Sequence, residues 1–214
     1  MIDGHLRLLL AWNAAINLTA ARDPLELARR HVLDSLAAVP ELRRLGARAF
    51  VDIGSGGGFP GITLAAALPA ERALLVESIR KKASFLETAV AATGLAPTVE
   101  VAAVRVEDLA TDPRQRERWP AVVARAVAPL PELVELSFPL LAQGGSLVAW
   151  KSDDSDEELE AGRRAVAGLG GGRIRIIGGV SPGRPDHQLV IATKRGATGA
   201  AYPRQPAARA RRPW

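Results

Sequence analysis

A glycine-rich turn between an apolar strand and a helix is the part of this sequence best suited to chemistry. The segment VDIGSGGGFPGI, residues 51–62, places five glycines within eight positions. Glycine lets the backbone approach a ligand closely, and the free N–H groups at the start of the next helix attract polar or anionic groups. The turn therefore predicts a site for a nucleotide cofactor.

The spacing of these glycines bears on which cofactor would bind. The dinucleotide fingerprint G-x-G-x-x-G requires glycine where this chain has Phe59. The chain instead has G-x-G-x-G from Gly54 to Gly58, with Asp52 two residues earlier. This arrangement resembles motif I of Rossmann-like methyltransferases and favours methyl transfer from S-adenosylmethionine (SAM). Hydride transfer from a dinucleotide, or a turn that serves only tight packing, stays open at this point.

An acidic residue ends the next strand-like run. The run RALLVE ends at Glu77, roughly 20 residues beyond the glycines, where a carboxylate can accept hydrogen bonds from ribose hydroxyl groups. Dinucleotide and SAM enzymes share this feature, so it supports a nucleotide without selecting one. The alternative is that Glu77 is an ordinary charge at the end of a strand.

Alternating strands and helices would position these residues. Strand-like runs occur at ARAFVDI, RALLVE, TVEVAAV, AVVARAV and GSLVAW, and helical segments at GITLAAAL, IRKKASFLETAVAAT, LPELVELSFPLLA and DEELEAGRRAVAGL. This alternation indicates parallel strands joined by helical crossovers, and the continuous apolar runs indicate a sheet covered on both faces. RIRIIGGV and HQLVIATK are joined only by the turn SPGRPD, so we expect one reversed strand. The sequence predicts an α/β, Rossmann-like fold with a mostly parallel seven-stranded sheet.

The two ends of the chain differ from this central region. LRLLLAWNAAI has helical spacing, and a second helix is expected to start at Asp23-Pro24 and stop before Pro40. Residues 196–214 have no periodicity, three prolines and several arginines, which predicts an extended, partly mobile tail. We therefore divide the chain into an N-terminal helical extension (1–45), a SAM-binding domain (46–195) and a basic tail (196–214).

Composition excludes several classes of protein. The chain has 214 residues and no cysteine, which excludes disulfides, thiolate zinc sites and a cysteine nucleophile. No apolar run is long enough to cross a bilayer, and the N-terminus lacks the order of a signal peptide, so we expect a soluble cytoplasmic protein without a metal site. The net charge of +5 permits a polyanionic partner but does not require one.

Longer motifs narrow the type of methyltransferase. WNAAINLTA, RRHVLDSL, FVDIGSGGGFPGI, VESIRKKASFLE, ARAVAPL and YPR occur in this order over nearly the whole chain. Together they resemble the small-subunit ribosomal RNA methyltransferase G family (RsmG or GidB). The resemblance implies methyl transfer from SAM to N7 of one guanine in a decoding-centre loop of 16S rRNA, with the 30S subunit as partner. Loss of such enzymes is linked to streptomycin resistance, and we expect a monomer.

The same resemblance assigns the cofactor-binding residues. They are Gly54, Gly56, Gly58, Phe59, Glu77, Ser78, Ile79, Val106, Glu107 and Arg125. Gly54 and Phe59 would line the methionine and ribose part of SAM, and Glu77 would bind the ribose hydroxyls. Val106 and Glu107 would border the adenine, with Glu107 or nearby backbone close to its amino group; the alternative for Glu107 is again an ordinary strand-end charge.

Arg125 is expected at the mouth of the pocket, where it would position groups rather than act as acid or base. It could reach the cofactor carboxylate, an RNA phosphate or the guanine O6, or it could pair with a structural carboxylate. Guanine N7 has an in-plane lone pair and no proton, so the reaction requires no general base. The enzyme must instead align N7, the methyl group and the sulfur.

Four residues are candidates for RNA binding: Asn17, Arg30, His31 and Lys151. Asn17 and His31, with Thr19, could equally form a structural polar network or cap helices. Basic residues at Arg29, Arg30, 80–82 and in the tail are candidates for phosphate contacts.

Three other functions compete with rRNA methylation. The first is a methyltransferase that acts on a small molecule or a protein, which would call for a substrate lid. The second is an NAD(P)-dependent oxidoreductase, which would bind NADH and not SAM. The third is a ribosome-assembly factor that keeps the fold and binds 30S particles without turnover.

Overall fold

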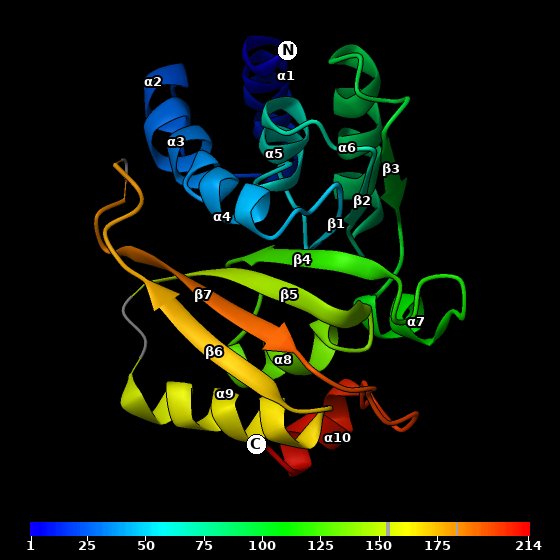
Figure 1. The fold of residues 1–214 in the computed structure, drawn as a ribbon. Helices are drawn as coiled ribbons and strands as arrows, with labels where there is room; N and C mark the ends of the chain where they lie inside the picture. The colour runs from blue at the N-terminus through cyan, green and yellow to red at the C-terminus, as the bar shows by residue number, and fades with distance from the viewer. Residues whose placement is uncertain (153–154, 183) are drawn as a thin grey trace.

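A seven-stranded sheet lies between two layers of helices (Figure 1). The computed structural model describes residues 1–152, 155–182 and 184–214. The strands are β1 (Ala49–Ile53), β2 (Arg72–Val76), β3 (Val99–Ala102), β4 (Trp119–Arg125), β5 (Leu141–Ser152), β6 (Gly172–Ile177) and β7 (His187–Lys194). Their order in the sheet is β3-β2-β1-β4-β5-β7-β6. β7 pairs antiparallel with both neighbours and the other pairs are parallel, which confirms the predicted single reversed strand.

The helices cover both faces of the sheet. They are α1 (Ile2–Ile16), α2 (Pro24–Leu27), a π-helical turn η1 (Ala28–Val32), α3 (Leu33–Leu36), α4 (Val39–Arg44), α5 (Gly61–Ala67), α6 (Arg80–Ala92), α7 (Val106–Thr111), α8 (Leu130–Ser137), α9 (Asp156–Gly168) and α10 (Pro206–Arg211). In Figure 1, α1 to α6 lie above the sheet, and α8, α9 and α10 lie below it.

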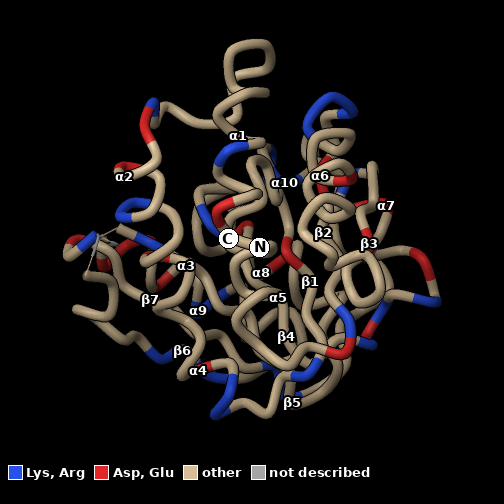
Figure 2. The backbone as a smooth tube through the Cα atoms, turned by 90° about the horizontal axis from the view of Figure 1, so that it is seen from above, with Lys and Arg blue, Asp and Glu red and all other residues tan. Residues whose placement is uncertain are grey.

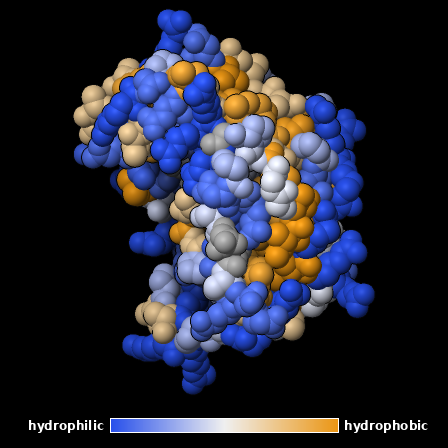
Figure 3. Space-filling model, turned by 90° about the vertical axis from the view of Figure 1, so that its left-hand side faces the viewer, coloured by the Kyte–Doolittle hydropathy of each residue, from blue (hydrophilic) through white to orange (hydrophobic). Residues whose placement is uncertain are grey.

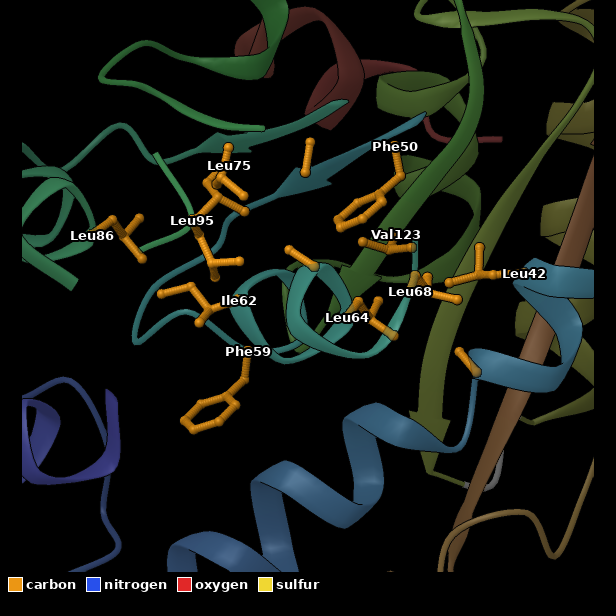
Figure 4. Close-up of a cluster of buried hydrophobic side chains, with 14 of the residues drawn as sticks. Leu42, Phe50, Phe59, Ile62, Leu64, Leu68, Leu75, Leu86, Leu95 and Val123 are labelled. Atoms are coloured by element: carbon orange, nitrogen blue, oxygen red, sulfur yellow. The ribbon is translucent and has the colours of Figure 1, made fainter. Parts of the chain in front are cut away.

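Side chains alternate between two apolar cores because successive residues of a strand point to opposite faces. Phe50 of β1 belongs to the core under α1 to α6, whereas Val51 and Ile53 belong to the core over α8 and α9. Figure 4 shows Phe50 in the first core together with Ile62 and Leu64 of α5. Both faces of the central strands are therefore buried, as the continuous apolar runs predicted, whereas the edge strand β6 has no buried residue.

Several element boundaries differ from the sequence expectations. The helix expected over residues 130–142 ends at Ser137, because β5 already begins at Leu141, and the helix α7 was not predicted. The single helix expected between Asp23 and Pro40 is divided into α2, η1 and α3, and Pro40 lies in the first turn of the separate helix α4. Proline is tolerated in a first turn because its missing N–H would have no partner there.

The expectation of an extended C-terminal tail was wrong. Residues 206–211 form α10, and the tail is held by a buried carboxylate. Glu135 of α8 has no exposed surface in its side chain, and its oxygens accept hydrogen bonds from the guanidinium of Arg204 and the indole Nε1 of Trp214. Arg116 also donates to the backbone carbonyls of Thr198, Gly199 and Tyr202. These partners lie far apart in sequence, so no local pattern could reveal them.

We expect the Arg204→Ala substitution to lower the free energy of unfolding by about 3–5 kcal/mol, because it leaves the Glu135 carboxylate buried without its cation. Urea denaturation of the purified protein measures this. The matched control is Arg7→Ala, which removes a pair with Asp3 whose two side chains are each 78% exposed. That change should cost no more than about 1 kcal/mol. Equal effects of the two substitutions would contradict the prediction.

Candidate functional site

The glycine turn leaves β1 in a left-handed backbone. Gly54, Gly56 and Gly58 all have positive φ, at 70°, 51° and 88°. Side chains with a Cβ rarely adopt this conformation, so the three glycines of the motif are the three positions that need it. At Gly58 a Cβ would also lie 2.6 Å from Ile62 Cδ1 and 2.9 Å from His5 Nε2.

Asp52 of β1 holds the far end of the turn through a backbone N–H group. Its side chain is fully buried, and Oδ2 accepts a hydrogen bond of 3.0 Å from the backbone N–H of Gly61. Burial raises the pKa of Asp52 to about 7, because the charged form is poorly solvated there. A Cβ at Gly61 would lie 2.5 Å from Asp52 Oδ2, so this contact depends on a glycine. Asp52, the acidic residue of the motif, therefore shapes the turn and does not face a ligand.

Glu77 joins the turn to the end of β2. Its Oε2 accepts from the N–H of Gly56 at 3.1 Å, and its Oε1 accepts from the N–H of Ile79 at 2.8 Å. A carboxylate oxygen has two lone pairs, so each oxygen can accept one further hydrogen bond. The side chain is only 7% exposed, and it lines a cavity at the carboxyl ends of the strands. Glu77 is therefore more than an exposed strand-end charge.

This first cavity has a volume of about 190 Å³. It brings together several of the predicted cofactor residues, namely Gly54, Glu77, Ser78, Val106 and Glu107. The residues that sequence reasoning missed are Val76, Val104, Arg105, Val127, Ala128, Glu132, Leu136 and Arg209. Four of them directly follow the carboxyl ends of β3 and β4, where ligands bind in such sheets, so the topology could have indicated these four. Arg209 comes from the tail and carried no local signal.

Phe59 and Ile79 do not line the first cavity. The ring of Phe59 is 6% exposed and lies between two histidines, 4.9 Å from the ring centroid of His5 and 5.0 Å from that of His31. Ile79 is 51% exposed beside the carboxylate of Glu77. Phe59, which departs from the dinucleotide fingerprint, thus anchors the turn to the N-terminal helices.

His5 of α1 also holds the turn and was not predicted. Its Nε2 donates to the carbonyl oxygen of Gly57 at 2.8 Å, so Nδ1 carries no proton in the neutral ring and has no partner among the described residues. Burial lowers the pKa of His5 to about 4, because the protonated ring would lose its hydration.

Arg125 at the end of β4 pairs with a structural carboxylate. This was one of the alternatives that the sequence left open. Its Nη1 donates to Asp34 Oδ2 at 2.9 Å, and its Nη2 donates to His31 Nδ1 at 2.8 Å. The guanidinium also lies 5.5 Å from the ring centroid of Phe59. Burial, followed by the neighbouring Arg125 charge, lowers the pKa of His31 to about 4, so the neutral ring can accept from Arg125.

Asp34 is the centre of this network. Its side chain is fully buried, Oδ1 accepts from His187 Nδ1 at 2.9 Å, and its backbone oxygen accepts from Trp150 Nε1 at 2.8 Å. Burial alone would raise the pKa of Asp34, but the hydrogen bonds from His187 and Arg125 outweigh it and hold this pKa below its usual value. The network ties α3 to the ends of β4, β5 and β7.

Three of the four predicted RNA residues have partners within the protein, and the fourth, Asn17, ends a helix. Asn17 ends α1 in a left-handed conformation, with φ 48°. Arg30 pairs with Glu26 on the surface, and His31 Nε2 lies 3.0 Å from Thr19 Oγ1. Lys151 of β5 pairs with Glu158 of α9. These contacts support the structural alternative for His31 and Thr19 and leave RNA binding untested.

A second cavity adjoins the first and shares Val127 and Ala128 with it. It has a volume of about 360 Å³ and is lined by Arg125, Ala126, Val127, Ala128, Pro129, Trp150, Lys151, Ser152, Glu158 and His187. Cationic, anionic and aromatic side chains converge there at the ends of β4 and β5. The segment between the cavities includes Ala126 in a left-handed conformation, with φ 57°.

A third hollow is mainly apolar and holds none of the predicted site residues. It lies between α3, α4, β6 and β7, on the face where Figure 3 shows apolar side chains gathered.

Basic residues are spread over several sides of the molecule (Figure 2), so charge alone marks no single RNA site. Within residues 1–152, 155–182 and 184–214, no group of three or more His, Asp or Glu could hold a metal ion. In the same ranges, no helix is both long and apolar enough to cross a membrane.

Sequence comparisons identify relatives over most of the chain. A family model described as rRNA small subunit methyltransferase G (GidB) matches residues 1–180. The Ribosomal RNA small subunit methyltransferase G of Roseiflexus castenholzii is 42% identical over 205 residues, which cover 96% of this chain and 87% of that protein. The protein of the same name from Moorella thermoacetica is 38% identical over 214 residues, which cover 100% and 89%.

Solved structures share the fold at lower identity. The O-methyltransferase from Bacillus cereus in complex with SAH has a TM-score of 0.64 and 19% identity, over 90% of this chain and 91% of that one. The O-methyltransferase TomG from Streptomyces achromogenes in complex with SAM has a TM-score of 0.61 and 22% identity, over 90% of each chain. These likenesses confirm the predicted fold class.

We expect Gly58→Ala to lower the free energy of unfolding by about 2–5 kcal/mol, since it combines a left-handed backbone with contacts to Ile62 and His5. The control is Gly94→Ala, where φ is 72° but a Cβ would meet nothing within 4 Å. It should cost about 1–2 kcal/mol from backbone strain alone. Urea titrations of both variants measure the difference, and equal losses would show that the contacts with Ile62 and His5 add no cost.

The buried ring of His5 should make stability depend on pH. The unfolded chain takes up a proton at this histidine below about pH 6.5, whereas the folded state does so only near pH 4. Stability should therefore fall as pH falls through this window. Between pH 7 and pH 5 the natural chain should lose about 2 kcal/mol more than His5→Gln, which can still donate to Gly57 but does not titrate. Urea titrations at both pH values measure this, and parallel losses would contradict it.

Proposed function

The chain belongs to the rRNA small subunit methyltransferase G (GidB) family, and from this premise we propose that it transfers a methyl group from SAM to N7 of one guanine in the decoding-centre loop of 16S rRNA. The observation that carries the proposal is the pair of adjoining cavities at the carboxyl ends of β1 to β5. Their shared wall, Val127 and Ala128, is where a methyl group would pass from one ligand to the other.

The lining of the first cavity supports its use as the SAM site. Glu77 offers carboxylate oxygens to the ribose hydroxyls, and Gly54 lets the turn pack closely against Val127 in the wall of this cavity, because a Cβ at Gly54 would lie 2.8 Å from Val127 Cγ2. Val106 and Glu107 at the start of α7 would border the adenine. SAM supplies an electrophilic methyl group when it is bound, and these residues orient it.

The second cavity would receive the target guanine, displaced from its loop. RNA-modifying enzymes take the reactive base out of its stack to reach it. Guanine N7 is a nucleophile without a proton, so Arg125, Lys151 and His187 need only position the base and exclude water. Arg125 is already oriented by Asp34 and His31, which suits a group that donates to the guanine O6 or to a phosphate.

The proposal includes a partner and a location. The 30S subunit or its 16S rRNA would be the substrate, and the exposed Arg29 and Arg30 of η1 lie on the same side of the sheet as the network that bounds the second cavity. Asn17 at the end of α1 and His31 in η1 would act on the RNA through the shape of the N-terminal helical extension. The enzyme would work as a cytoplasmic monomer.

A small-molecule or protein substrate is the second candidate, since the structural relatives are O-methyltransferases that share only the fold.

Methyl transfer to 30S subunits from a strain that lacks this activity tests the proposal. With labelled SAM we expect one 7-methylguanosine in one loop of 16S rRNA, identified by mass spectrometry. Glu77→Gln should lower the affinity for SAM at least about tenfold, because a charge-assisted acceptor for the ribose is lost. The control Glu71→Gln changes an exposed surface pair with Arg48 and should leave the activity unchanged.

Two results would contradict the proposal in different ways. SAM binding without label on 30S subunits or naked 16S rRNA would favour the small-molecule or protein substrate. NADH binding without SAM binding would favour the oxidoreductase.

A further inference from the structure

A residue of the C-terminal tail enters the first cavity from below the sheet. Arg209 of α10 is only 9% exposed and lines the cavity beside Glu107 and Glu132. Its Nη2 donates to Glu107 Oε1 at 2.7 Å and to Glu132 Oε1 at 2.9 Å, and its Nε donates to the same Glu132 oxygen at 3.1 Å. One guanidinium thus holds two carboxylates, one on α7 and one on α8.

Contacts within the tail hold Arg209 in place. Its Nη1 donates to the backbone oxygen of Arg204, whose side chain pairs with the fully buried Glu135. The C-terminal Trp214 donates to the same Glu135. The planar guanidinium loses little further freedom when it binds, so it can hold a carboxylate in one orientation.

The pair with Arg209 decides how Glu107 faces the cavity. An ionised carboxylate only accepts hydrogen bonds, and Arg209 takes up Oε1. The same guanidinium nitrogen also donates to Glu132, so Arg209 joins the carboxylates of α7 and α8 at the cavity wall. Glu107 is 7% exposed, so without this cation its charge would be poorly compensated.

We propose that Arg209 is a positioning residue that orients the Glu107 carboxylate to accept from the exocyclic amino group of the cofactor's adenine. The inference rests on the proposed function, because it takes the first cavity as the SAM site. An acceptor in this place favours adenine, which carries an amino group at position 6. It disfavours hypoxanthine, which carries a carbonyl oxygen there that would face the carboxylate.

Binding of two product analogues tests the proposal. S-adenosylhomocysteine and S-inosylhomocysteine differ in the base, where the amino group at position 6 and the accepting N1 of adenine are replaced by a carbonyl oxygen and an N1–H. Calorimetry gives their affinities for the full chain. We expect the natural protein to prefer the adenine form at least about tenfold. Arg209→Gln should bring this ratio close to one, and Arg209→Lys should restore part of it because it keeps the charge but not the fork geometry.

A double-mutant cycle separates positioning from general support of the fold. If Arg209 acts through Glu107, then Arg209→Gln should change the adenine preference little once Glu107→Gln is present. The control is Arg164→Gln, which removes a hydrogen bond to the backbone oxygen of Trp214 and should leave the preference unchanged. Loss of stability by itself would lower both affinities and leave their ratio unchanged.

Each outcome bears on one claim. An unchanged ratio in Arg209→Gln, or fully additive effects in the cycle, would overturn the role of Arg209. If Arg209→Gln does not fold, Arg209→Lys decides: a ratio equal to that of the natural chain overturns the proposal, and an intermediate ratio supports it. Failure of the natural chain to bind S-adenosylhomocysteine would instead contradict the proposed function.

Discussion

The buried carboxylate of Asp34 is the constraint on which the rest of the site depends. A fully buried charge is tolerated only when its hydrogen bonds are satisfied, and Asp34 obtains them from Arg125 and His187, which belong to the strands β4 and β7. Its backbone oxygen adds Trp150 of β5. One residue of a short helix thereby fixes the N-terminal segment to the carboxyl edge of the sheet, where both cavities lie.

Phe59 extends this constraint to the glycine turn. Its ring packs against His31, which accepts from Arg125, and against His5, which donates to Gly57. The N-terminal helices therefore hold the turn from one side, and Asp52 and Glu77 hold it through backbone N–H groups from the other. The left-handed backbone of the turn is maintained by contacts on both sides, as a preorganised cofactor site requires.

The opposite layer of helices is closed by the tail. Glu135 and Glu107 each pair with an arginine that follows them by many residues, so the chain end completes the lower wall of the first cavity. These pairs are ionic and buried, and they impose geometry more than they add stability. The tail thus links the fold of the last residues to the shape of the cofactor pocket, while the N-terminal helices shape the pocket beside it.

The sequence alone determined the sheet, its reversed strand and the glycine turn, because apolar periodicity and left-handed backbone leave local signals. Family motifs also indicated Glu77, Val106 and Glu107, which the fold gathers around one cavity. Only the tertiary structure decided the partners of Arg125, the burial of His5 and Phe59, and the helical tail with Arg209. Ion pairs between residues tens of positions apart have no local periodicity, since they depend on where the folded chain brings charges together.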